Sequence, residues 1–288
     1  MYWLPLFLAV FLGRTLAHSW IEQLTVVING IFTGENGYPR GYVPRNSQGF
    51  SDKAMVYLLP PSESYRTRVN STDLICAPTQ RTSSQTASYG RLQAMAGSRV
   101  ALKYLENGHV TIPQNQHGKP PGAGTVYVFG TSHPSTNELL ASVLEWTSEG
   151  LGGDGRGKLL AARTFDDGRC YQINKGSISL LRQKEFPDPF PDQPGSFHGQ
   201  WCEIDFIVPR NVPVGSLYTV YWVWAWPTRA GVPGLPDGKD EYYTTCSDLN
   251  IITGPIRNGT SNSLSGQDPQ TAALPGCPTT YTAYPLTT

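Results

Sequence analysis

The sequence has 288 residues, and its 22 lysines and arginines are balanced by 22 aspartates and glutamates, which gives a formal net charge of zero. This balance excludes the basic face of a nucleic-acid-binding protein and a polybasic membrane patch. Glycine (30), proline (24) and tyrosine (15) are abundant, while charged residues make up only 15% of the chain. This composition is typical of many short strands joined by turns.

The first seventeen residues are typical of a secretory signal peptide. The run from Trp3 to Leu12 is almost entirely apolar, and small residues precede a cleavage point after Ala17. This run is too short for a membrane span, and no other apolar stretch approaches the roughly 18 residues that a spanning helix needs. We therefore expect a signal peptide over 1–17 and a secreted, extracellular chain that begins at His18.

A histidine at the mature N-terminus is a chelating residue. Its α-amino nitrogen and its imidazole nitrogen can bind one metal ion together. The amine has an ordinary pKa near 8, so a metal ion displaces only a weakly held proton. Removal of the signal peptide would therefore create a candidate metal ligand at His18.

The mature chain is dominated by runs of β-branched and aromatic residues, and we predict a β-sandwich. The expected strands are 21–28, 54–59, 100–104, 126–130, 204–208 and 217–224. The only clear helical pattern is 139–146, within a connection. We expect one domain over 18–254, with long loops, and a disordered Ser/Thr/Pro-rich tail over 255–288, since that segment has little apolar material.

The five cysteines suit an oxidising compartment, where disulfides are expected with one thiol left over. Their pairing is not determined by the sequence. Two N-glycosylation acceptors, Asn70 and Asn258, fit the same compartment. The cysteines are Cys76, Cys170, Cys202, Cys246 and Cys277.

Two further motifs are decoys. The glycine-rich segment 150–155 matches G-x-G-x-x-G, but it follows a helical pattern and no crossover helix is evident after it. A flexible loop is therefore expected there, not a nucleotide site. Asp166 and Asp167 could suggest a pair of hydrolase carboxylates, but adjacent aspartates before a glycine usually form a turn.

A second imidazole would complete a copper site built on His18, because Cu(II) favours nitrogen ligands in a planar arrangement. His109 follows the predicted strand 100–104, and His117 lies in a loop eight residues later. Solvent exposure is the default expectation for His117, His133 and His198, which lie in loops of proline, serine and glycine.

The segment near Cys246 supplies one more candidate pair. In a strand, Glu241 and Tyr243 point to the same side. The tyrosine could occupy a weak axial position at a metal, and the glutamate could accept or donate a hydrogen bond beside it. Taken alone, the pattern is better explained by a packed Tyr243 and a solvated Glu241.

Taken in order, these features resemble the lytic polysaccharide monooxygenases, a family of secreted copper enzymes. The chain has the signal peptide followed directly by His18 and a family-like cysteine segment at Cys76. Its 96–102 stretch is similar to the family's "AG-x-x-V" strand, and 201–218 to the strand that ends "P…G-x-Y". Glu241-x-Tyr243-x-x-Cys246 resembles the "[Q/E]-x-Y-x-x-C" strand, and its acidic version is similar to the chitin-active fungal branch.

The resemblance implies an all-β, immunoglobulin-like or fibronectin III-like sandwich that holds one copper ion. It implies the amine and imidazole of His18 with His109 as ligands, Tyr243 as axial group and Glu241 beside them. It also implies the disulfides Cys76–Cys246 and Cys170–Cys202. The implied activity is oxidative cleavage of a β-linked polysaccharide, chitin or cellulose, by a monomer that receives electrons from an external donor.

The chain also departs from the family pattern. The connection after His109 is longer than usual, which leaves His117 open as the second ligand. We favour His109 because it is nearer the end of the expected strand. The Trp-rich segment 218–227 lacks the histidine that some members place near the copper.

Two alternatives therefore stand beside the enzyme. The first is a non-oxidative copper-binding protein of the same fold, acting in copper acquisition or on a cell-wall glycan. The second is a metal-free carbohydrate-binding sandwich that uses exposed Trp and Tyr.

Overall fold

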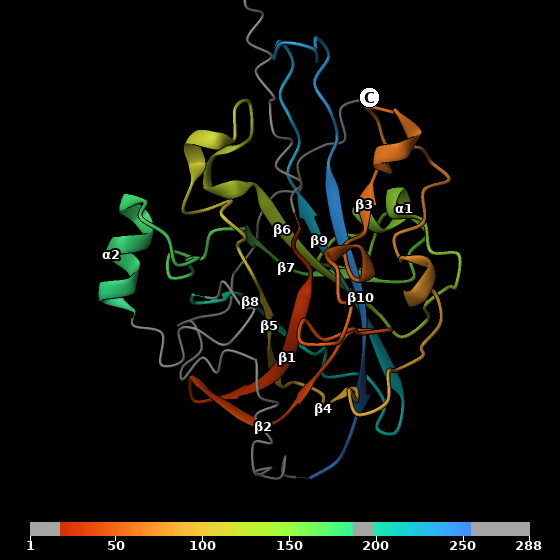
Figure 1. Ribbon diagram of the computed structural model, residues 1–288. Helices are drawn as coiled ribbons and strands as arrows, with labels where there is room; N and C mark the ends of the chain where they lie inside the picture. Colours follow the sequence, from red (N-terminus) through yellow and green to blue (C-terminus); the bar gives the residue numbers. More distant parts are fainter. Residues whose placement is uncertain (1–17, 187–198, 255–288) are drawn as a thin grey trace, which may run out of the picture.

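A computed structural model describes residues 18–186 and 199–254, which form an immunoglobulin-like β-sandwich, so the predicted all-β fold class is confirmed (Figure 1). One sheet has four strands in the order β2-β1-β5-β8, and the other has six, in the order β3-β10-β9-β6-β7 with β4 parallel to β10. The strands are β1 (Ile21–Ile28), β2 (Ile31–Gly37), β3 (Leu58–Leu59), β4 (Leu92–Ala94), β5 (Arg99–Tyr104), β6 (Thr125–Thr131), β7 (Lys158–Thr164), β8 (Cys202–Ile207), β9 (Leu217–Ala225) and β10 (Tyr242–Ile251).

Helices are short in the described part of the chain. Figure 1 shows the two α-helices on opposite sides of the view, α1 (Leu140–Leu144) and α2 (Ser177–Glu185). Neither they nor any other helix among the described residues is long and apolar enough to cross a membrane. The 3-10 turns are η1 (Asp52–Ala54), η2 (Ser62–Ser64), η3 (Pro78–Gln80), η4 (Pro113–Asn115) and η5 (Pro121–Ala123).

The central strand β9 is buried on both faces. Its Trp222 and Trp224 belong to the cluster between the two sheets, while its Tyr221 and Val223 belong to a second cluster on the outer face. Trp146, beside α1, is buried in that outer cluster. A strand covered on both sides needs apolar residues at successive positions, which explains the continuous apolar run of β9.

Both disulfides that the resemblance implies are present in the structure. Cys76 is bonded to Cys246 of β10, and Cys170 to Cys202 of β8, with Cα–Cα distances of 5.7 Å and 4.6 Å. Two disulfides fit an oxidising compartment. The segments 1–17 and 255–288, and with them Cys277 and Asn258, lie outside the described residues, as does His198; Asn70 is exposed.

Two predictions of secondary structure were wrong. The expected strand 54–59 is reduced to the two residues of β3, because η1 takes up 52–54. Helix α2 was not predicted. Only one of its nine residues, Ser179, is buried, and Leu180 and Leu181 are exposed. An apolar stripe is the signal by which a surface helix is recognised in a sequence, and α2 has none.

Candidate metal centre

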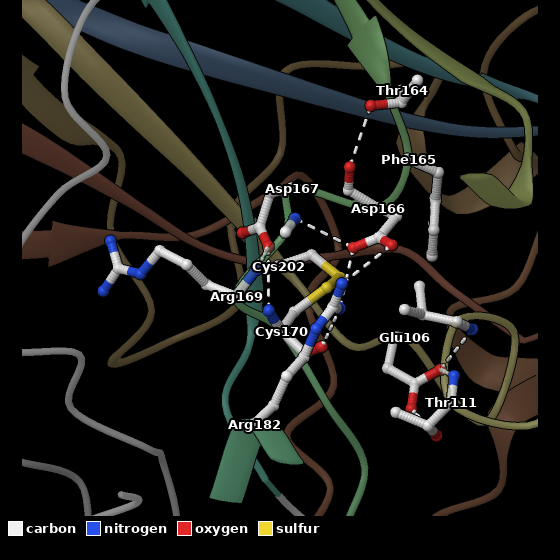
Figure 2. A network of polar contacts seen from close by, with 12 residues as sticks. Glu106, Thr111, Thr164, Phe165, Asp166, Asp167, Arg169, Cys170, Arg182 and Cys202 are labelled. Carbon is white, nitrogen blue, oxygen red and sulfur yellow. Dashed lines mark hydrogen bonds and ion pairs between the residues drawn. A yellow bond between two sulfur atoms is a disulfide. The ribbon is translucent and has the colours of Figure 1, made fainter. Parts of the chain in front are cut away.

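His109 lies in a tight turn directly after β5. The turn uses positive φ angles at Asn107 (50°) and Gly108 (80°), and the backbone N–H of His109 donates to the carbonyl of Glu106 at 2.9 Å. The Glu106 carboxylate accepts hydrogen bonds from the backbone N–H of Val110 at 2.7 Å and from the side chain of Thr111 (Figure 2). A buried carboxylate therefore fixes the backbone that carries His109.

Glu106 also joins this turn to a distant segment. It accepts a further hydrogen bond from the backbone N–H of Gln172 at 2.7 Å, close to the Cys170–Cys202 disulfide. Burial raises the pKa of Glu106, although these hydrogen bonds oppose the shift because they stabilise the carboxylate. The position of His109 therefore depends on two segments of the chain that are 66 residues apart.

The imidazole of His109 is buried among aromatic rings. Its centroid lies 4.6 Å from that of Trp226 and 5.2 Å from that of Trp224, and only 4% of the residue is exposed. Its Nε2 atom is buried and has no hydrogen-bond partner among the described residues. Buried polar atoms are normally paired, so an unpaired imidazole nitrogen has room for a ligand that the chain itself does not supply.

The electrostatic surroundings keep the His109 imidazole neutral. Burial is the main cause that lowers the pKa of His109 to about 3, and electrostatic repulsion from Lys119 and His18 contributes to the same shift. A neutral imidazole is the form that binds metal ions. His18 and His109 are 91 positions apart in the sequence, and their segments are joined by a hydrogen bond from the Asn107 side chain to the carbonyl of His18.

His18 stands immediately before β1 and is tied to the His109 turn, because its backbone carbonyl accepts a hydrogen bond from the Asn107 side chain. Its Nδ1 atom lies 3.2 Å from Oδ2 of Asp52, and 30% of its side chain is exposed. Burial lowers the pKa of His18, and the neighbouring Asp52 carboxylate opposes this shift. Sequence analysis did not single out Asp52, since a lone aspartate in a 3-10 turn carries no pattern.

Glu241 and Tyr243 meet, as their spacing predicts. The Tyr243 hydroxyl donates a hydrogen bond of 2.7 Å to Oε1 of Glu241. Burial raises the pKa of Tyr243 well above its ordinary value, and the Glu241 carboxylate adds to this shift. The Tyr243 ring lies 4.9 Å from that of Trp224, the same ring that packs against His109.

Lys119 is a second residue of this cluster, after Asp52, that sequence analysis missed. Its Nζ atom lies 2.6 Å from Oε2 of Glu241, 2.9 Å from the carbonyl of Trp226 and 3.9 Å from the centroid of the Trp226 ring. Burial lowers the pKa of Lys119, and Glu241 opposes this effect. The lysine belongs to the long connection after His109. The unusual length of that connection was the one feature of the sequence that could have indicated an additional residue at the site.

Of the other histidines, the two that the structure describes, His117 and His133, do not join the cluster. His117 and His133 are exposed, and in the described part of the chain His117 makes no hydrogen bond or ion pair with His18 or His109. The loop that contains His117 instead covers the turn, because the Gln116 side chain donates to the carbonyl of His109 at 2.6 Å.

Asp166 and Asp167 form a turn and not a hydrolytic pair (Figure 2). Asp166 accepts from the backbone N–H of Gly168 and pairs with Arg182, while Asp167 accepts from the N–H groups of Arg169 and Cys170. Asp167 also lies close to Cys170 and Cys202, but these sulfurs are bonded to each other and offer no thiolate to a metal ion.

The tryptophans contradict the idea of a carbohydrate-binding surface built on exposed indole rings. All six in the described residues are at most 2% exposed, so none of these indole rings is available to stack on a sugar. An exposed aromatic ring that could stack on a sugar is instead provided by Tyr65, which is 95% exposed. The buried tryptophans are Trp20, Trp146, Trp201, Trp222, Trp224 and Trp226.

Solved structures with some likeness to this chain are polysaccharide monooxygenases and related proteins. CvAA9A is 12% identical with a TM-score of 0.36, and the match covers 87% of this chain and 84% of that chain. A cellulose-active polysaccharide monooxygenase from M. thermophila is 14% identical with a TM-score of 0.35, and covers 91% and 87%. The extended catalytic domain of H. jecorina LPMO9A is 12% identical with a TM-score of 0.33, and covers 89% and 78%.

Likenesses as distant as these assign no activity to the chain. No curated protein matches its sequence. A family model does match, over residues 15–275, and this range includes the whole sandwich. The chain therefore belongs to the family described as DUF7492, a domain of unknown function.

Proposed function

We propose that the chain is a secreted copper protein that cleaves a β-linked polysaccharide oxidatively. In this proposal the signal peptide 1–17 is removed, and the freed amine and the imidazole of His18 bind one copper ion together with Nε2 of His109. Tyr243 would supply a weakly bound oxygen beside the ion. The observation that carries the proposal is the buried, unpaired Nε2 atom of His109, in a turn whose Asn107 side chain donates a hydrogen bond to the carbonyl of His18.

The donor set suits copper. Imidazole and amine nitrogens are ligands that Cu(II) favours, and the Tyr243 phenol would add an oxygen atom to this set. The bound ion would supply one-electron redox chemistry with electrons from an external donor. The protein would contribute a fixed arrangement of nitrogens, because His109 is held by the Glu106 turn and by the Trp224 and Trp226 rings.

Glu241 and Lys119 would set the charge beside the metal. The ion pair places one negative and one positive group next to the Tyr243 hydroxyl, and both side chains are only 11% exposed. A pair with so little solvent around it keeps its orientation, so Glu241 would offer a fixed hydrogen-bonding partner to a bound reactant.

The remaining parts of the proposal concern location and partners. The two disulfides and the exposed acceptor Asn70 fit a secreted glycoprotein. We propose a monomer with a single domain over 18–254, followed by the Ser/Thr/Pro-rich tail. Its substrate would be chitin or cellulose, or another cell-wall glycan with β-linkages.

The decisive experiment uses full-length protein secreted with a correctly processed N-terminus, which mass spectrometry verifies. The protein is loaded with copper and incubated with a reductant and with chitin or cellulose. Oxidised oligosaccharides in the mass spectrum are the expected result, and they should be missing from a His18→Ala control. Tight copper binding with no oxidised product on several glycans would reject the enzymatic activity.

One observation favours a second candidate, a copper-binding protein without oxidative activity. The Asp52 carboxylate lies at Nδ1 of His18, where it could serve as an acidic third ligand, while the Tyr243 hydroxyl is already engaged by Glu241. The electron paramagnetic resonance spectrum of the Cu(II) protein separates the two candidates. A change in the spectrum of Asp52→Asn, with none in Tyr243→Phe, would favour the second.

A further inference from the structure

A cavity of about 240 Å³ lies at the other end of the sandwich from the candidate metal centre. It is lined by the end of β6, the start of β7, the start of β9 and the glycine-rich loop 150–157. Tyr218 lines the cavity and Trp224 packs against His109, and both belong to β9. Six residues at about 3.3 Å each separate the two sites by roughly 20 Å.

The glycine-rich loop is a built wall and not the flexible segment that its composition suggests. Gly157 lies against the ring of Trp146, where a Cβ atom would come within 2.1 Å of a ring carbon. The Trp146 Nε1 atom donates to Asp154 at 3.0 Å, and the Thr131 hydroxyl donates to the carbonyl of Arg156 at 2.5 Å. The loop therefore holds a fixed shape before any ligand arrives.

Among the described residues, the cavity wall carries one unpaired cation, Lys158, beside an arginine and a histidine. Arg156 is engaged by the carboxylates of Glu138 and Asp154, which hold it in the wall. Lys158 and His133 also line the cavity, and within the described part of the chain neither side chain has a hydrogen-bond or ion-pair partner. No carboxylate is among the described residues that line the cavity.

We propose that this cavity binds a small oxyanion, a carboxylate or phosphate group that is free or carried on one sugar unit. The ammonium group of Lys158 would form a charge-assisted hydrogen bond with it, and His133 would add a second donor. The size supports a small ligand, since about 240 Å³ is below the ~300–1,000 Å³ that is usual for drug-sized ligands. The proposal does not depend on copper, because the site is remote from His18.

Three probes test the chemistry, namely glucuronate, inorganic phosphate and neutral glucose, each added to the full mature chain labelled with ¹⁵N-glycine. Four of the glycines line the cavity, namely Gly130, Gly150, Gly155 and Gly157. Their amide signals should shift with glucuronate, with phosphate or with both. A response to only one of them identifies which oxyanion the site takes. Gly108, in the His109 turn, should not respond.

A matched pair of lysine variants makes the test specific. Lys158→Met should weaken binding about tenfold, the loss expected for one charge-assisted hydrogen bond. Lys175→Met, which removes an exposed lysine outside the cavity, should bind as the parent chain does. Thermal melting verifies that both variants fold. Equal shifts with glucose, unchanged affinity in Lys158→Met, or no response to either anion would overturn the proposal.

Discussion

The hydroxyl group of Tyr243 donates a 2.7 Å hydrogen bond to one carboxylate oxygen of Glu241, two positions earlier in the chain. The other carboxylate oxygen lies 2.6 Å from Nζ of Lys119. One carboxylate thus connects the final strand β10 to the long loop after His109. The three side chains form a continuous polar contact inside an otherwise aromatic region, with Trp226 against Lys119 and Trp224 against Tyr243.

The first prediction concerns the stability that this contact provides. Lys119→Met leaves the Glu241 carboxylate without its cation, and breaking one side of a pair with so little solvent around it costs about 2–4 kcal/mol. Urea unfolding of the variant should show a loss of that size. Lys184→Met, at an exposed position of α2, is the control and should change the free energy of unfolding by less than about 0.5 kcal/mol. Equal losses of unfolding free energy in the two variants would mean that the Lys119–Glu241 ion pair does not stabilise the fold.

The second prediction separates the two histidines that the sequence left open. His109→Ala should lower copper affinity at least about 100-fold in calorimetric titration, because it removes the buried imidazole nitrogen beside His18. His117→Ala removes an exposed imidazole and should leave the affinity unchanged. The opposite ranking would assign the second ligand to His117, and equal affinities in both variants would place the copper elsewhere.

Features that depend on neighbouring positions in the chain were predicted from the sequence. Contacts between distant segments were not. Strand β1 has the bounds that its apolar run predicts, and Glu241 and Tyr243 meet because two positions along an extended chain bring side chains to one side. Lys119 and Asp52 could not be found in this way. Each reaches the site from a loop or turn whose path depends on tertiary packing, and a single lysine or aspartate leaves no periodic signal.

The third prediction is a pH dependence of stability that arises from Glu203 in β8. Burial, with the neighbouring Asp205 as a second cause, raises the pKa of Glu203 to about 9 from 4.5. The folded state therefore holds a proton that the unfolded chain releases above pH 4.5. The free energy of unfolding should consequently fall as pH rises from about 5 to 9, by at most about 1.4 kcal/mol per pH unit from this group.

Glu203→Gln isolates this contribution, because glutamine has the shape of the protonated acid and does not titrate. Unfolding in urea at several pH values should give a flatter dependence for the variant than for the parent chain between pH 5 and 9. Parallel curves for the two proteins would contradict the raised pKa of Glu203.

The fourth prediction ranks the two disulfides. A bond that closes a longer loop restricts the unfolded chain more, and the sequence separations are 170 residues for Cys76–Cys246 and 32 for Cys170–Cys202. Chain entropy gives about 5 kcal/mol for the first and about 4 kcal/mol for the second. Replacing both cysteines of a pair by alanine should therefore lower the melting temperature more for Cys76 and Cys246.

The shorter disulfide has a second, local consequence that melting alone does not detect. Cys170 is two residues from Gln172, whose N–H donates to the Glu106 carboxylate in the His109 turn. Loss of the Cys170–Cys202 bond should therefore speed hydrogen exchange at Val110, the other backbone amide that Glu106 holds at 2.7 Å, while loss of Cys76–Cys246 should not. Equal protection of Val110 in both double variants would show that the turn keeps its shape without the disulfide beside it.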